Sequence, residues 1–177
     1  AVEEVEAESK GVPPLGVKIA QILLDSEANA GHPALEAFRR PENRPFAPYM
    51  FYKDYFAEGR PAWVPKRFVA LLDVLAAAPE TGGAPVLSHP GAYFQRTTAK
   101  DARVLREHGL AGMEVYTFYH TAEQTEAYRW LAAELDLVAT AGSDFHGRIK
   151  PHVAFGALAE GDYGMVERLR ERRGGAA

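Results

Sequence analysis

The chain has 177 residues, enough for one domain with a buried core and too few for two domains of ordinary size. Hydrophobic residues make up 47% and charged residues 25%, which excludes general disorder. With 24 acidic and 20 basic residues, the chain has a net charge of −4, which does not indicate nonspecific binding of nucleic acid. The absence of cysteine excludes disulfides, thiolate catalysis, zinc fingers and iron–sulfur clusters. Any metal site must therefore use His, Asp or Glu.

The first segment, residues 1–15, is acidic, with glutamates at positions 3, 4, 6 and 8. It lacks the basic and then apolar order of a signal peptide. No part of the sequence approaches the roughly 18 uninterrupted apolar residues of a membrane-spanning helix. We therefore expect an acidic N-terminal tail on a soluble, cytoplasmic protein that does not interact with a membrane.

Residues 16–66 form a segment rich in proline and aromatic side chains, which we expect to be a helical insertion. Residues 16–29 place apolar side chains at helical spacing. A second helix is predicted over residues 48–59, because proline stands at its start and glycine at its end. Its aromatic residues share one face, and packing is a more common use of such a stripe than stacking of nucleic-acid bases. We interpret the stripe as packing.

Short apolar runs alternate with helical runs from residue 67 to residue 173. We expect parallel strands at residues 84–88, 112–117, 137–141 and 153–158. Helices are predicted at residues 68–78, 99–108, 122–135 and 163–173. Such alternation is typical of parallel β/α units. The predicted fold class is α/β, with about four parallel strands, fewer than a closed barrel of about eight requires.

The first three predicted strands each end in a polar cluster, where function gathers in parallel α/β folds. The first strand runs through PVLSHPG to His89. The second, GMEVYTFYH, carries Glu114 and reaches His120, and the third, LVATAGSDFHG, ends with Asp144 and His146. His, Glu and Asp side chains at three neighbouring strand ends predict one convergent polar site.

The sequence GSDFHG has a spacing that suits metal binding. In an extended strand, residues i and i+2 point to the same side, about 7 Å apart, so Asp144 and His146 would face one pocket. A carboxylate and an imidazole at that separation suit one metal ion or two adjacent ions. An equally common use of this short pattern is an Asp that caps the following turn beside an exposed His.

His89 follows a buried apolar run and stands before Pro90 and Gly91, in a tight turn. A lone histidine there is more often a hydrogen-bonded structural residue than a ligand, but its coincidence with the Asp144 cluster favours metal binding. Glu114 lies inside an apolar strand, where an unpaired carboxylate is costly. It therefore requires a partner, either a metal ion or a basic side chain.

His120 and Arg148 are the candidate substrate-binding residues. His120 could contact a phosphate or donate a proton, while an N-cap role of Thr121 explains the same segment more simply. Arg148 lies on the loop after His146 and could neutralise phosphate oxygens, although a surface arginine needs no function.

The usual nucleophile and phosphate-loop motifs are missing from the sequence. Neither Ser88 nor Ser143 lies in a G-x-S-x-G elbow. No glycine-rich loop of the P-loop or dinucleotide-binding type occurs either. Metal-assisted hydrolysis is the coherent chemistry that remains.

The motifs PVLSHPG, GLAGMEVYTFYH and LVATAGSDFHGRIKP, in that order and spacing, resemble the carboxyl-terminal half of the PHP (polymerase and histidinol phosphatase) family. Upstream, FYKDYFAEGRPAWVP is similar to the preceding stretch in the branch of metal-dependent phosphoesterases that act on nucleotides and RNA ends. The resemblance extends over about residues 16–156, and the ordered set of motifs is specific where each motif alone is not.

The resemblance implies part of a distorted (β/α)7 barrel, and hydrolysis of a phosphomonoester or phosphodiester of a nucleotide or of an RNA or DNA end by metal-activated water. It implies that His89, Asp144 and His146 are metal ligands, and that His120 and Arg148 contact substrate. The implied cofactors are divalent ions, Mn, Fe, Zn or Mg, up to three in a complete site. The implied partner is a small phosphorylated molecule.

The chain departs from the family pattern at its start. PHP proteins begin with a strand that carries H-x-H-x-x-x-S-D-G, whereas the first histidine here is His32, in AGHPALE. We therefore expect an incomplete form that lacks the N-terminal strands and their ligands. Two alternatives stay open, a non-catalytic PHP-like binding or structural module and a metal-dependent amidohydrolase on a similar barrel.

Overall fold

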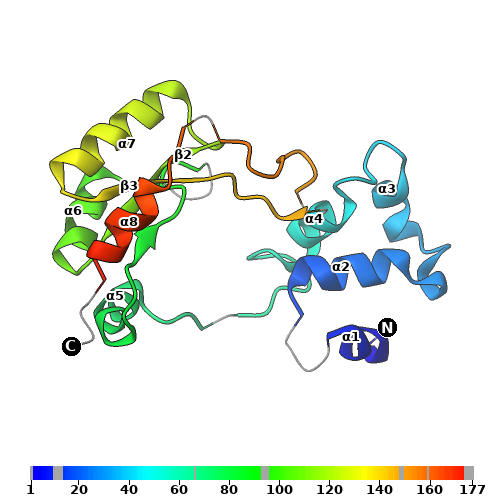
Figure 1. The fold of residues 1–177 in the computed structure, drawn as a ribbon. Coiled ribbons are helices and arrows are strands. Elements are labelled where there is room, and N and C mark those ends of the chain that lie inside the picture. Colours follow the sequence, from blue (N-terminus) through cyan, green and yellow to red (C-terminus); the bar gives the residue numbers. More distant parts are fainter. Residues whose placement is uncertain are drawn as a thin grey trace. The chain divides into compact units, whose positions relative to one another are not determined.

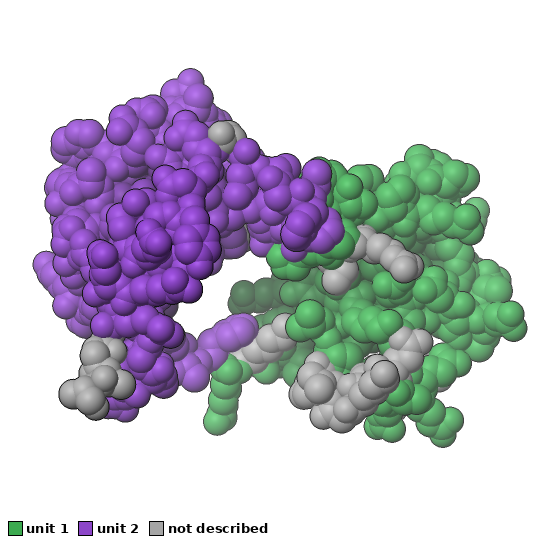
Figure 2. All heavy atoms as spheres, in the orientation of Figure 1, with its two compact units in different colours: residues 1–67, 146–153 green, residues 68–145, 154–177 purple. Residues whose placement is uncertain are grey.

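The computed structural model of the chain describes residues 2–9, 14–65, 67–92, 96–147, 150–158 and 160–173. The chain divides into two compact units (Figure 2). Unit 1 comprises Ala1–Arg67 and His146–Val153, and unit 2 comprises Phe68–Phe145 and Ala154–Ala177. The division into a tail, an insertion and a β/α segment with separate roles stays a prediction.

Unit 1 is built from helices and turns. Its elements in chain order are α1 (Val2–Ser9), α2 (Gly16–Asp25), the 3₁₀ turns η1 (Glu27–Asn29) and η2 (Pro33–Leu35), α3 (Glu36–Arg39), α4 (Ala47–Phe51) and the π-helical turn η3 (Tyr52–Phe56). The acidic N-terminal segment thus contains a helix. The helix predicted over residues 16–29 ends at Asp25, because Ser26 adopts an extended backbone conformation before η1 begins.

The aromatic stripe of unit 1 packs into the core of that unit, which confirms its interpretation as packing. Phe51 is buried together with Phe38, and their rings meet edge to face with centroids 5.3 Å apart. Tyr55 stacks on Phe51 with centroids 4.5 Å apart. Aromatic pairs of this geometry add to the stability given by their buried area.

Unit 2 contains a parallel sheet of three strands in the order β1-β2-β3. The strands are β1 (Val86–Leu87), β2 (Gly112–Thr117) and β3 (Val138–Gly142). The helical elements are α5 (Leu71–Ala77), the 3₁₀ turn η4 (Pro79–Thr81), α6 (Ala99–Glu107), α7 (Ala122–Glu134) and α8 (Gly164–Glu171). This arrangement confirms the α/β class (Figure 1). In the described part of the chain, no helix is long and apolar enough to cross a membrane.

The prediction of a fourth strand at residues 153–158 is wrong. Gly156 has a φ of 68°, in the left-handed region that interrupts an extended chain, and the Ala157 N–H donates to the Ala154 carbonyl across a turn. Phe155 is 86% exposed, so the apolar residues that suggested a strand have no sheet to pack on. The described residues therefore form three strands rather than about four.

The core of unit 2 lies between the sheet and helices α5, α6 and α7. Met113 and Val115 of β2 are fully buried and pack with Leu75 of α5, Leu105 of α6 and Leu131 of α7. Figure 1 shows α7 running along β2 and β3, against which it packs. Since side chains alternate along a strand, Glu114 projects from the face opposite Met113.

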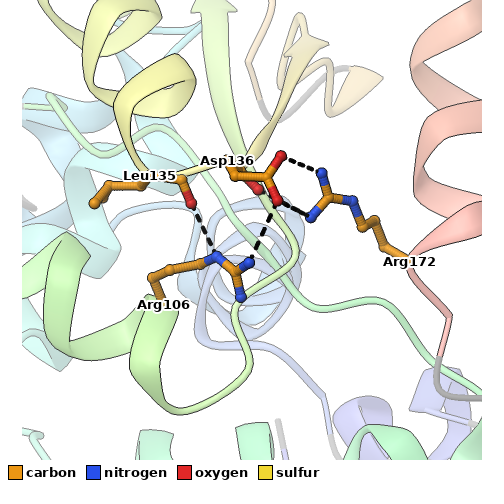
Figure 3. Close-up of polar contacts among 4 residues, drawn as sticks. All are labelled: Arg106, Leu135, Asp136 and Arg172. Carbon is orange, nitrogen blue, oxygen red and sulfur yellow. Dashed lines mark hydrogen bonds and ion pairs between the residues drawn. The ribbon is translucent and has the colours of Figure 1, made fainter.

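A charged cluster ties α8 to the turn between α7 and β3 (Figure 3). The Arg172 guanidinium donates to both carboxylate oxygens of Asp136 and to the Asp136 carbonyl oxygen. Arg106 of α6 donates to the Leu135 carbonyl and lies 3.5 Å from the same carboxylate. Asp136 has a φ of 51°, and these contacts hold its left-handed turn in place. The hydrogen bond from Arg172 lowers the pKa of Asp136.

A pair of leucines on α5 tests this packing. Leu75 is 2% exposed and Leu71 is 52% exposed on the same helix. We expect Leu75→Ala to lower the free energy of unfolding by about 2–5 kcal/mol, because it leaves a cavity in the core. The matched control Leu71→Ala should cost less than about 1 kcal/mol in urea titrations of both variants. Equal losses would contradict the described core.

Candidate functional site

The site of unit 2 lies where its three parallel strands end. His89 follows β1 by two residues and Asp144 follows β3 by two residues. Glu114 lies within β2, and Tyr119 and His120 follow the end of that strand. Because neighbouring parallel strands end at one edge of a sheet, these five residues gather there, as the sequence predicted for the histidines and carboxylates.

Glu114 is bonded to the turn after β1. The His89 N–H donates to Glu114 Oε2 over 2.6 Å, so the partner that this carboxylate needs is a backbone amide. Burial raises the pKa of Glu114, and the bond from His89 opposes that rise. The pairing of β2 with β3 shifts register between Glu114 and Tyr116, a bulge of the kind that aims side chains at functional sites.

Both proposed strand-end ligands adopt a left-handed backbone. The φ angle is 30° at His89 and 54° at Asp144. Non-glycine residues avoid this region at a cost of about 1–2 kcal/mol, and such strain gathers at functional sites. The extended geometry that would have set Asp144 and His146 on one side does not hold, because β3 ends at Gly142 and Asp144 turns the chain.

Tyr119 connects the two strand ends. Its hydroxyl donates to Asp144 Oδ2 over 2.6 Å. Its ring meets the His89 ring edge on, with centroids 5.3 Å apart. His89 and Asp144 therefore border the same side chain within unit 2.

His120 holds the His89 turn from the other side. The Gly91 N–H donates to His120 Nε2 over 3.0 Å, so this nitrogen carries a lone pair. Nδ1 lies 2.9 Å from the Val115 carbonyl and must then be the protonated nitrogen of a neutral ring. Burial lowers the pKa of His120, in agreement with this form. Tyr128 stacks on the ring with centroids 4.9 Å apart.

The N-cap role of Thr121 is confirmed. Its hydroxyl accepts the Gln124 N–H, and the Gln124 side chain accepts the Thr121 N–H in return, which completes a capping box at the start of α7. The substrate contact of His120 stays a prediction. In this structure both of its ring nitrogens bond to the backbone.

Of the predicted site residues, His89, His120 and Asp144 lie at this edge of unit 2. His146 begins the segment His146–Val153 of unit 1. Arg148 lies outside the described residues. Among the residues that the structure describes, no group of three or more His, Cys, Asp or Glu side chains is placed to hold a metal ion. The donor types still suit a divalent cation, since imidazole and carboxylate are ligands of such ions.

Sequence reasoning did not identify Tyr119 as part of the site and left the partner of Glu114 open. The charge of Glu114 inside an apolar strand was a signal that it had a special role. Tyr119 gave no comparable signal, because a tyrosine in a loop is common and its bond to Asp144 depends on how β2 and β3 end.

A cavity of about 490 Å³ opens beside His120. Its walls come from the end of β2, the start of α7 and the segment before α8, and include Tyr116, Phe118, Glu126 and Glu160. This volume lies in the range of small-molecule sites, about 300–1,000 Å³.

The neutral state of His120 predicts a pH dependence of stability. The unfolded chain takes up a proton at this ring near its ordinary pKa of about 6.5, before the folded chain does. The contribution of His120 to the free energy of unfolding is thus fully present above about pH 6.5 and is lost as the pH falls below that value. Between pH 8 and pH 5.5, wild type should lose more unfolding free energy than His120→Gln.

Urea titrations at the two pH values measure this difference. The exposed Trp130 has no titratable group, so Trp130→Phe serves as the control and should keep the wild-type pH dependence. If His120→Gln also kept it, the neutral, bonded imidazole would be refuted.

Comparisons with curated proteins reveal related phosphate-ester hydrolases. The chain is 29% identical over 97 residues to the 3′,5′-nucleoside bisphosphate phosphatase of Chromobacterium violaceum, and 34% identical over 117 residues to the phosphoribosyl 1,2-cyclic phosphate 1,2-diphosphodiesterase of Eggerthella lenta. It is 31% identical over 101 residues to the 5′-3′ exoribonuclease Rnm of Escherichia coli. These alignments cover 54%, 64% and 54% of the chain but 34%, 44% and 33% of the relatives. The chain thus spans less than half the length of these relatives.

Two solved structures share the fold. A Bifidobacterium adolescentis protein assigned as a metal-dependent phosphoesterase superposes with a TM-score of 0.71 at 24% identity, over 98% of this chain and 56% of that one. An amidohydrolase from Chromobacterium violaceum superposes with a TM-score of 0.60 at 20% identity, over 99% of this chain and 64% of that one. At these identities the two structures inform on the fold alone.

The motifs, the curated relatives and the fold of the chain agree with one another. No protein-family model matches the chain. The ordered motifs around His89, Glu114 and Asp144 nevertheless lie at the ends of adjacent parallel strands, as the resemblance implied. The curated relatives agree with the resemblance of these motifs to the PHP family, and the two solved structures share the fold of the chain.

Proposed function

We propose that the protein is a metal-dependent phosphoesterase that hydrolyses a phosphomonoester or phosphodiester of a nucleotide or of an RNA or DNA end. The observation that carries this proposal is that His89 and Asp144, which follow the two strands flanking β2, both have left-handed backbone conformations and both lie against Tyr119. Three curated relatives that act on phosphate esters support the same chemistry.

The proposed metal ligands are His89, Asp144 and His146. The first two contribute an imidazole and a carboxylate, which suit Mn, Fe, Zn or Mg, up to three ions in a complete site. When bound, such an ion supplies a hydroxide nucleophile and neutralises the charge that develops on the phosphate oxygens. The chain's own part is to hold these donor groups at the strand ends.

The cavity beside His120 is the proposed place for the organic part of a small phosphorylated substrate. Its aromatic walls, Tyr116 and Phe118, offer flat apolar surface, and Glu126 and Glu160 offer acceptors for hydroxyl or amino groups. Carboxylates repel phosphate, so the phosphate would lie toward the proposed ligands instead. Arg148 is the proposed phosphate contact on the loop after His146.

Hydrolysis assays on the full chain test this proposal. We expect release of phosphate from 3′- or 5′-phosphorylated nucleotides, or shortening of 5′-phosphorylated oligoribonucleotides, in the presence of Mn²⁺ and its loss after EDTA treatment. His89→Ala and Asp144→Asn should each lower the rate at least about 100-fold, since even residues that only support metal ligands cost about 10–100-fold.

His108→Ala, on an exposed histidine of the same unit, is the matched control and should keep the wild-type rate. Hydrolysis of a panel of amides without hydrolysis of phosphate esters would indicate an amidohydrolase and overturn the proposal. A metal-dependent rate of phosphate-ester hydrolysis that is the same in wild type, His89→Ala and Asp144→Asn would also overturn the proposal.

A further inference from the structure

The central strand β2 carries side chains that reach both of its neighbours. It lies between β1 and β3, whose ends bear His89 and Asp144. Three side chains within or just after this strand, those of Glu114, Tyr119 and His120, bond to residues that follow the neighbouring strands. Residues of β2 and of the segment after it are not among the proposed ligands, but they contact two of those ligands, His89 and Asp144.

The contacts toward β1 fix the His89 turn at two points. Glu114 Oε2 accepts the His89 N–H over 2.6 Å, and His120 Nε2 accepts the Gly91 N–H over 3.0 Å. Pro90, between these amides, is fully buried. A bond between an amide and a carboxylate is among the stronger hydrogen bonds of proteins. It can therefore hold His89 at its left-handed φ of 30°.

Close packing leaves this turn little freedom to shift. A Cβ at Gly91 would lie 2.9 Å from His120 Cδ2 and 2.8 Å from Tyr128 Cε2. The glycine therefore lets the turn approach the imidazole that accepts its amide. The Gln124 side chain also donates to the Gly91 carbonyl over 3.3 Å.

The contacts toward β3 fix Asp144. The Tyr119 hydroxyl donates to Asp144 Oδ2 over 2.6 Å, which orients the carboxylate. The Glu114 carboxylate packs against Gly142, where any Cβ would overlap Glu114 Oε1. A Cβ at the last residue of β3 would therefore require the Glu114 carboxylate to shift.

We propose that Glu114, Tyr119 and His120 are positioning residues, which set the His89 turn and the Asp144 carboxylate in place for a divalent metal ion without binding that ion themselves. This inference rests on the proposed function. Glu114 and His120 act through backbone amides of the His89 turn, and Tyr119 acts through the carboxylate of Asp144. Partners of this kind orient metal ligands, and their loss commonly costs about 10–100-fold in affinity.

Cobalt titration of the full chain tests the inference, with calorimetry for affinity and visible absorption for ligand geometry. Glu114→Gln and Tyr119→Phe should each weaken Co²⁺ binding by about 10–100-fold and alter the visible bands, with the same number of ions per chain at saturation. Gly142→Ala should act in the same direction as Glu114→Gln, because the added methyl group displaces the carboxylate. Glu107→Gln and Tyr163→Phe, on exposed residues of α6 and of the segment before α8, should bind as wild type does.

A merely structural role would lower the melting temperature but leave the affinity and spectrum of the folded chain unchanged. Tyr119→Phe removes a single oxygen atom, so it keeps the test valid if a Glu114 variant fails to fold. If wild type binds Co²⁺ and both Glu114→Gln and Tyr119→Phe bind it equally well with the same bands, the positioning inference fails while the proposed function stands. If wild type takes up no Co²⁺, the proposed function itself fails.

Discussion

The Glu114 carboxylate is held within the sheet by a hydrogen bond from the backbone of His89. Burying a carboxylate is costly unless hydrogen bonds replace its lost water, and this bond replaces part of it. Several features of unit 2 depend on that requirement. A glycine at the end of β3 leaves room for the Glu114 carboxylate, and the turn after β1 presents an amide to it rather than a carbonyl. The Glu114 carboxylate of β2 thus contacts the turn after β1 and the last residue of β3, and it joins the three strands at the edge where the proposed ligands lie.

The fold could be predicted where local pattern and tertiary packing agree. The strand predicted at 112–117 matches β2 residue for residue, and the helix predicted at 122–135 differs from α7 by one residue. Met113 and Val115 alternate into the core there, and a capping box fixes the start of the helix. The strand predicted at 153–158 had apolar residues without a partner strand, and a glycine of left-handed φ ended it. Composition within a short run cannot reveal whether a neighbouring strand exists to receive it.

The candidate site was predictable in its residue types and only partly in its geometry. Strand-end position placed His89 and Asp144 in one region, because parallel strands end at one edge. The i, i+2 argument for Asp144 and His146 failed, since it assumed an extended chain beyond the last residue of β3. The bonds from Gly91 to His120 and from Tyr119 to Asp144 join residues 29 and 25 positions apart, which no local pattern encodes. The sequence thus indicated which chemical groups the site contains, whereas the topology of the sheet determined which of these groups bond to one another.

The central proposal is that the strand ends of this chain form the metal-binding site of a phosphoesterase. Elemental analysis of bound metal per chain, after purification without chelator, tests it most directly on wild type and on the Asp144→Ala/His146→Ala double variant. The account predicts divalent metal in near-stoichiometric amount in wild type and its loss in the double variant, with the two proteins equally folded by circular dichroism. Metal retained in full by the double variant, or absent from wild type, would contradict it.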